Sequence, residues 1–131
     1  MDTVLETKVI SKFMRQSKRD RYIDFIQKNT TRHKFIDELS HSQTFKDDLF
    51  EKIDGSEAET IRRIAVKFGI RDCYIISENA KIDGQRMGID DALKLAISPW
   101  SDTTTLIVLG DAQLIYREHD GVKNKWISKI K

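Results

Sequence analysis

Four basic residues near the N-terminus form the clearest charge pattern in the sequence. They recur at spacings of three and four residues, which places them on one face of a helix. The four are Lys8, Lys12, Arg15 and Arg19. Like charges at these spacings repel one another, so the stripe is a candidate surface for nucleic acid or for an acidic protein. A solvated helix face, or neutralisation by the acidic segment 37–59 of the same chain, also explains the pattern.

A polar segment at positions 77–86 is the second place where the residue types suit chemistry. Its carboxylates, Glu78 and Asp83, are of the kind that hold Mg²⁺ in proteins. Either Lys81 or Arg86 could stabilise developing negative charge beside them. A metal-dependent hydrolase or nuclease would need the two carboxylates to converge in a concave pocket. A solvated loop with an Asp-Gly turn is the alternative interpretation.

Three residues on a predicted helix have the types that bind metals. His33, Asp37 and His41 recur at intervals of four residues, which brings imidazole and carboxylate groups to one face. They extend over two full turns, however, which is too long a span for one ion. They also lie opposite the apolar residues Phe35 and Leu39, on the expected solvent side. We therefore predict no metal site here.

The other common routes to catalysis lack their motifs. The sequence contains no nucleophile elbow, no glycine-rich phosphate loop and no dinucleotide-binding fingerprint. Cys73 lies in an apolar run without a basic neighbour in sequence, which indicates a buried core residue rather than a nucleophile. We predict no cofactor, and Glu78 and Asp83 remain the only weak catalytic candidates.

The composition indicates one soluble domain. Of the 131 residues, 39% are apolar and 34% are charged, which leaves enough apolar surface for one packed core. The net charge of +2 is too small for the molecule as a whole to attract nucleic acid or a membrane, but positive and negative residues are concentrated in different segments. The segments 1–35, 36–60 and 61–131 carry +5, −6 and +3. The single cysteine and the lack of a membrane-spanning apolar run favour a cytoplasmic location.

Apolar periodicity predicts two helical segments in the first forty residues. Between residues 4 and 28 apolar residues recur at spacings of three to five, but the stripe changes face near positions 16–19. The helix either breaks there or is covered on two sides. A second helix follows, capped by Thr30 or Thr31, with Phe35, Ile36 and Leu39 facing inward.

Two further helices are predicted before residue 70. Thr44 and Asp47 suit the start of a short helix with Phe45, Leu49, Phe50 and Ile53 inward. Ser56 and Glu59 form the clearest capping box in the chain, and Gly69 suits the end of that helix. Its predicted inward residues are Ile61, Ile64, Ala65 and Phe68.

The second half of the sequence is dominated by predicted strands. An apolar, β-branched run at 73–77 indicates the first strand, and a helix at 89–97 follows the polar loop. Segments 103–109, 112–119 and 122–130 then form an antiparallel meander with two tight turns. If each turn has two residues, the facing pairs are Ile107 with Leu114, Ile115 with Trp126, and Leu114 with Ile127.

These patterns together predict an α+β fold and a binding function. We expect about four N-terminal helices packed on a mostly antiparallel four-stranded sheet formed by the C-terminal half. The single domain would span residues 1–131, with a helical half at 1–69 and a strand-rich half at 70–131. The missing catalytic motifs favour a non-enzymatic binding or regulatory module that contacts another protein, such as an immunity or antitoxin-type inhibitor. Nucleic-acid binding and metal-dependent hydrolysis are the alternatives, and no membrane contact is expected.

Overall fold

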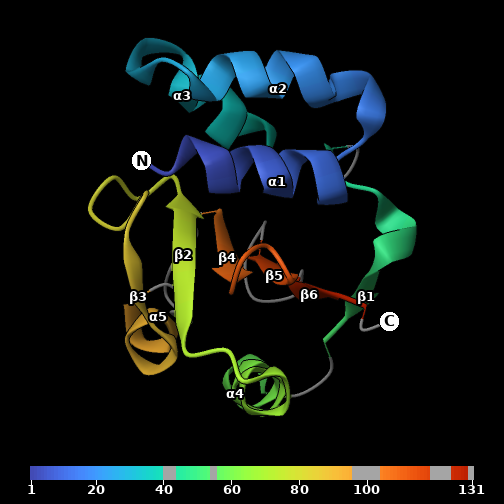
Figure 1. Ribbon diagram of the computed structural model, residues 1–131, viewed down its shortest axis with the longest axis vertical. Coiled ribbons are helices and arrows are strands. Elements are labelled where there is room, and N and C mark those ends of the chain that lie inside the picture. Colours follow the sequence, from blue (N-terminus) through green and yellow to red (C-terminus); the bar gives the residue numbers. More distant parts are fainter. Residues whose placement is uncertain (40–43, 54–55, 96–103, 119–124, 130–131) are drawn as a thin grey trace.

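The computed structural model describes residues 1–39, 44–53, 56–95, 104–118 and 125–129 (Figure 1). These residues form five α-helices, two short 3₁₀ helices and six strands. The α-helices are α1 (Thr3–Phe13), α2 (Arg19–Ile26), α3 (Asn29–Glu38), α4 (Glu57–Phe68) and α5 (Ile89–Leu95), and the 3₁₀ helices are η1 (Gln16–Lys18) and η3 (Asp47–Leu49). The strands are β1 (Phe50–Lys52), β2 (Asp72–Ser77), β3 (Arg86–Gly88), β4 (Thr105–Leu109), β5 (Leu114–Glu118) and β6 (Lys125–Ser128).

All six strands belong to one antiparallel sheet with the order β1-β6-β5-β4-β2-β3. The α+β class is therefore confirmed, and the predicted number of four strands is wrong. The four predicted strands form the centre of the sheet, while β1 and β3 are its edges. Each edge strand has only three residues, which is too short to produce a recognisable alternation of apolar and polar side chains.

The helix predicted to begin at Thr44 is also wrong. The segment instead contains η3 and then the edge strand β1, which pairs Phe50 with Ser128 of β6. Phe45 and Phe50 are both buried, and their rings meet edge to face at 5.5 Å. Pairing with β6 and burial of these two rings outweigh the local helical pattern, because short helices gain little from propensity alone.

The first helical segment breaks where the apolar stripe changes face. Helix α1 ends at Phe13, and the extended Met14 forms an isolated bridge with Phe45. The Arg15 amide donates to the Thr44 carbonyl at 3.0 Å, so this bridge fixes the direction in which the chain leaves α1. Helix α3 begins earlier than predicted, at Asn29, and no side chain caps it.

The register of the central hairpin differs from the prediction by two residues. Leu109 pairs with Leu114 across a four-residue connection, rather than the predicted two-residue turn, so Ile107 lies opposite Tyr116. Tyr116 in turn pairs with Ile127, and the predicted turn at 120–121 lies outside the described residues. A shift of two residues keeps every side chain of these strands on its own face of the sheet.

Helices cover both faces of the sheet (Figure 1). Helix α1 lies between the sheet and the α2–α3 pair, while α4 and α5 lie on the opposite face. Tyr74 and Ile76 of β2 belong to the core beneath α1, whereas Cys73 and Ile75 belong to the core beneath α4 and α5. This alternation follows from the period of two along a strand, and it makes β2 a strand buried on both faces.

Helix α4 has the boundaries that the sequence predicts. The Ser56 side chain accepts a hydrogen bond from the Glu59 amide, and Gly69 adopts a left-handed conformation with φ of 65° at the other end. Ile61, Ile64 and Ala65 are buried as expected. Phe68, which was expected inward, is 39% exposed in the last turn.

Candidate functional site

The basic stripe predicted on the first helix is divided among three elements. Lys8 and Lys12 lie on α1, Arg15 follows the helix in extended conformation, and Arg19 begins α2. The prediction that the four cations share one helical face is therefore wrong. The cause is the break at Phe13, which changes the chain direction before the third member of the stripe.

Three of these cations contact other parts of the same chain. Lys8 forms an ion pair with Asp111 at 2.8 Å. The Lys12 ammonium donates to the carbonyl oxygens of Ala112 and Gln113. These contacts hold α1 against the β4–β5 connection, so the two lysines serve the fold.

Arg15 is held by the segment that precedes β1. Its Nε donates to the Phe45 carbonyl at 3.1 Å, and its guanidinium forms an ion pair with Asp47 at 3.2 Å. Asp47 belongs to the acidic segment 37–59, so the predicted internal neutralisation occurs at this one residue of the stripe. Arg19 is exposed at the start of α2.

A buried ion network joins the helical layer to the sheet. The guanidinium of Arg32 on α3 donates through two nitrogens to the Glu6 carboxylate on α1, at 2.5 and 2.8 Å. It also donates to both oxygens of Asp83 in the β2–β3 loop, at 2.8 and 2.9 Å. The three side chains are at most 7% exposed. Burial alone would lower the pKa of Arg32, but the hydrogen bonds that it donates to Asp83 and Glu6 raise it, so the guanidinium stays charged.

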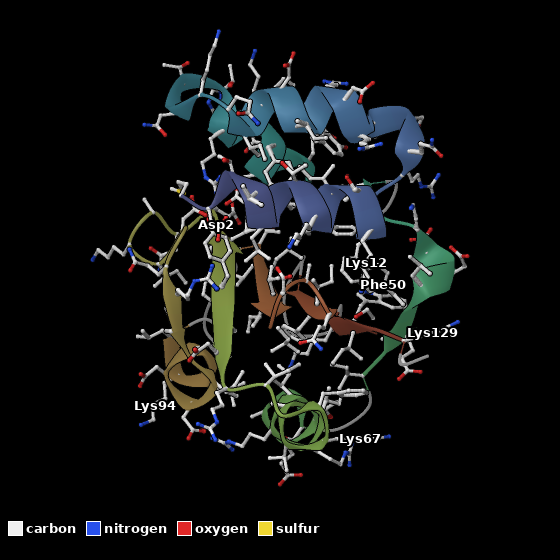
Figure 2. The ribbon with its side chains drawn as sticks, viewed as in Figure 1. Asp2, Lys12, Phe50, Lys67, Lys94 and Lys129 are labelled. Carbon is white, nitrogen blue, oxygen red and sulfur yellow. The ribbon has the colours of Figure 1, made fainter. Side chains whose placement is uncertain are left out.

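The network continues to the surface through β2. The Tyr74 hydroxyl donates to Glu6 at 2.6 Å and accepts from the Asp2 amide. Burial, followed by the bond to Glu6, raises the pKa of Tyr74. Asp2 also caps α1 and pairs with Arg86 of β3 at 2.6 Å, beside the end of β2 (Figure 2). Each charged side chain of this cluster is thus paired with another group of the same chain, and the cluster serves the fold.

The two carboxylates proposed for metal binding have separate partners. Asp83 is occupied by Arg32 and also accepts from the Ser77 amide. Glu78 accepts from the Thr104 amide. Because both carboxylates are committed to protein donors, their contacts give no support to a magnesium site. No group of three metal-binding side chains occurs among the described residues, and His41 lies outside them.

Cys73 is a core residue, as the sequence predicts. It is 1% exposed, and its thiol donates to the Met87 carbonyl at 3.5 Å. Burial, with a smaller contribution from Asp72, raises the pKa of the thiol to about 12. A thiol that stays protonated at neutral pH is a poor nucleophile.

An open groove lies between α4 and α5 on the far face of the sheet. Its volume is about 540 Å³, and its floor includes Ala65 and Ile70. Its lining residues belong to α4, to the segment between α4 and β2, to the end of β3 and to the first turn of α5, where the Ile89 amide donates to the Arg71 carbonyl at 3.3 Å. We call this surface the α4–α5 face; it consists of Arg62, Ala65, Val66, Ile70, Arg71, Gly88, Ile89, Asp90 and Asp91.

The α4–α5 face combines exposed apolar and charged side chains. Val66 lines the groove and is 82% exposed, and Leu95 at the end of α5 is 57% exposed. Arg62, Arg71, Asp90 and Asp91 are its exposed charged residues, while Lys67 and Lys94 lie outside it, on the outer sides of the same two helices (Figure 2). An exposed valine beside a groove is the kind of residue that contributes apolar contact area when a partner covers it.

The sequence analysis predicts neither the ion network nor this face, although each has a recognisable signal in the sequence. Glu6 lies three residues before the buried Val9, inside the apolar stripe of α1, and Arg32 lies three residues before the buried Phe35. A charged residue within an apolar stripe indicates a buried charge. Val66 gives the opposite signal, because it is an apolar residue out of phase with the buried side of α4.

Comparisons of the chain with protein-family models, with curated proteins and with solved structures found no match. Within the described ranges, no helix has the length and apolar character that crossing a bilayer requires. A functional inference therefore rests on the geometry of the chain itself, and chiefly on the α4–α5 face.

Proposed function

We propose that this chain is a small, non-enzymatic module that binds a protein partner through the α4–α5 face. The observation that carries the proposal is the exposure of Val66 beside an open groove with charged walls. Apolar contact at the centre and charged residues around it is the common composition of protein interfaces. An immunity or antitoxin-type inhibitor is one example of this functional class.

The distribution of charge supports a protein partner over nucleic acid. Nucleic-acid sites gather cations that are free to meet phosphates. In this chain Lys8, Lys12 and Arg15 are engaged with carbonyls or carboxylates of the same chain. The α4–α5 face carries aspartates as well as arginines, and Asp90 and Asp91 would repel a phosphate backbone.

A capture experiment with matched variants tests this proposal. The tagged chain is incubated with lysate of its source cells, with and without nuclease treatment, and retained proteins are identified by mass spectrometry. Val66→Asp places a charge on the exposed apolar residue of the face, so we expect it to abolish capture of the partner. Val4→Asp is the control, because Val4 is 68% exposed on α1, far from the groove in sequence and on the other helical layer.

The expected result is a protein retained by the unmodified chain and by Val4→Asp, insensitive to nuclease, and lost with Val66→Asp. Capture that nuclease removes, and that Arg19→Glu weakens while Val66→Asp does not, would contradict the proposal. That pattern would instead support binding of nucleic acid by the N-terminal cations, with an affinity that falls steeply as salt is raised.

A further inference from the structure

An Asp-Gly pair occurs three times in the sequence, and one of the three lies within the described residues. The pairs are 54–55, 83–84 and 120–121. Asp-Gly is the aspartate dipeptide most prone to isomerise, because glycine has no side chain to hinder attack of its amide nitrogen on the carboxyl group. Asp83-Gly84 is such a pair in the β2–β3 loop, and its aspartate belongs to the buried ion network.

The fold requires both residues of this pair. Gly84 has a φ of 76°, in the left-handed region that other residues rarely adopt, and its amide donates to the Ile75 carbonyl at 2.8 Å. Asp83 accepts from the Arg32 guanidinium and from the Ser77 amide. Because the loop needs the glycine and the network needs the aspartate, the architecture itself places a reactive dipeptide at this position.

The same contacts oppose isomerisation in the folded chain. Both carboxylate oxygens of Asp83 accept from Arg32, at 2.8 and 2.9 Å. Attack by the Gly84 nitrogen must expel one of these oxygens, which breaks its hydrogen bonds. The peptide units on both sides are also held, because the Asp83 amide donates to the Asn79 carbonyl at 3.0 Å and the Gly84 amide to the Ile75 carbonyl. The reaction therefore needs the loop to open first.

We propose that Asp83-Gly84 is a latent isoaspartate site that the network of Arg32 keeps closed. When the network opens, the Gly84 nitrogen bonds to the side-chain carboxyl carbon of Asp83. One carboxyl oxygen leaves as water with the amide proton and a proton from solvent, which gives a cyclic succinimide. Water then adds to the former backbone carbonyl of Asp83, the carbon–nitrogen bond there breaks, and the two protons return to the amide and to solvent.

The product is an isomer whose main chain runs through the former side chain, and it cannot restore the network. Its main chain is longer by one methylene group, and its free carboxylate is attached directly to the Cα atom. That carboxylate no longer reaches Arg32 and the Ser77 amide together. A transient opening between α3 and the β2–β3 loop thus becomes permanent. The inference does not depend on the α4–α5 face.

Ageing of the purified chain tests this site. The chain is incubated at neutral pH with and without concentrated urea, and isoaspartate at each Asp-Gly pair is measured by peptide mapping and by methylation with an isoaspartyl methyltransferase. In urea we expect the three pairs to react at rates within about threefold of one another, because local sequence dominates in the unfolded chain. Without urea the rate at Asp83 should be at least about tenfold lower than in urea, because only the open fraction reacts.

Two variants separate the network from general stability. Arg32→Lys keeps the charge but loses the planar fork that holds Glu6 and Asp83, so the rate at Asp83 should rise at least about fivefold. Ile61→Ala is the control, because it destabilises the chain through a cavity in the core beneath α4, away from the network. Its rate at Asp83 should stay within about twofold of the unmodified chain. Circular dichroism establishes that each variant is folded.

Three results would overturn the inference. They are an unmodified folded chain that isomerises at Asp83 as fast as it does in urea, a folded Arg32→Lys variant whose rate is unchanged, and an Ile61→Ala variant whose rate rises as far as that of Arg32→Lys. The first comparison uses no variant, so it decides the matter even where a substitution prevents folding.

Discussion

The two helical layers of this protein use charge in opposite ways. On the side of α1–α3 one cluster of charged groups is buried and fully paired: Arg32 alone makes four hydrogen bonds to Glu6 and Asp83. On the side of α4 and α5 the charges are exposed and flank a groove with Val66 at its margin. The first layer is closed by contacts within the chain, and the second leaves contacts for a partner.

The comparison shows that residue type is a weak guide to a site. The N-terminal cations and the polar loop carry the residues best suited to chemistry, yet the structure commits most of them to structural bonds. Asp83, a candidate metal ligand, instead holds Arg32 beneath the loop. Burial of an ion pair fixes the position of elements at a high cost of desolvation, so such groups are seldom free for a ligand.

The largest effect on the free energy of unfolding is expected for a substitution in the buried ion network of the α1–α3 side. Arg32→Met leaves the carboxylates of Glu6 and Asp83 buried without a counter-ion, and we expect it to lower the free energy of unfolding by about 3 to 5 kcal/mol. Urea denaturation followed by circular dichroism measures the change. A loss below about 1 kcal/mol, the size expected of an exposed pair, would mean that the network is not a closed structural element.

A triple variant separates charge from packing at the same place. Glu6→Gln, Arg32→Met and Asp83→Asn together remove all three charges and keep similar volumes. Because no unpaired charge remains, this variant should be more stable than Arg32→Met alone. A triple variant that is less stable than Arg32→Met would assign the effect to lost hydrogen bonds instead.

The pH dependence of stability tests whether the core beneath α4 and α5 is closed to water, although the groove above it is open. The Cys73 thiol ionises near pH 9 when unfolded but near 12 in the folded chain, because it is buried. Between these values the unfolded state loses its proton first, so this contribution to stability is complete below pH 9 and is lost as pH rises. We expect the free energy of unfolding to fall by roughly 1 kcal/mol between pH 9 and 10 from this group.

The matched control for this effect is Cys73→Ala. The quantity compared between the two chains is the slope of the free energy of unfolding against pH, because the substitution also changes its absolute value. The two slopes, from urea denaturation between pH 8 and pH 10, should differ by the contribution of the thiol. Tyr22 and Tyr74, whose pKa values are also raised by burial, are common to both chains. Equal slopes would mean that water reaches the core beneath α4 and α5.

The smallest effect on stability is expected on the open layer itself. Val66 is 82% exposed and packs little against the fold, so Val66→Asp should change the free energy of unfolding by less than about 0.5 kcal/mol. The same urea denaturation measures it. A loss of several times this value would show that α4 needs Val66 for folding, and the distinction between a closed and an open layer would fail.

Much of the fold could be predicted from the sequence, and the errors have physical causes. The buried stripe of α1 and both ends of α4 follow from local spacing and capping, which depend on near neighbours in the chain. The edge strand β1 does not, because Phe50–Lys52 becomes a strand only by pairing with β6. The sequence predicts a two-residue turn before β5, but the connection has four residues, which shifts the register by two.

The candidate site was harder to predict, because exposure depends on which helices meet. The sequence places Val66 out of phase on α4, but it does not place α5 and its aspartates beside that helix. Likewise, the separation between Glu6, Arg32 and Asp83 in the chain hides the network that joins them. Contacts between distant segments decide both features, and no local spacing reports them.

The most direct test of the central claim compares two exposed valines in the cells that make this protein. A photoreactive amino acid replaces Val66 on the open layer or Val4 on the closed one, and adducts formed on irradiation are resolved by mass. The account predicts a specific protein adduct only at position 66. Equal adducts at both positions, or an adduct at position 4 alone, would contradict it.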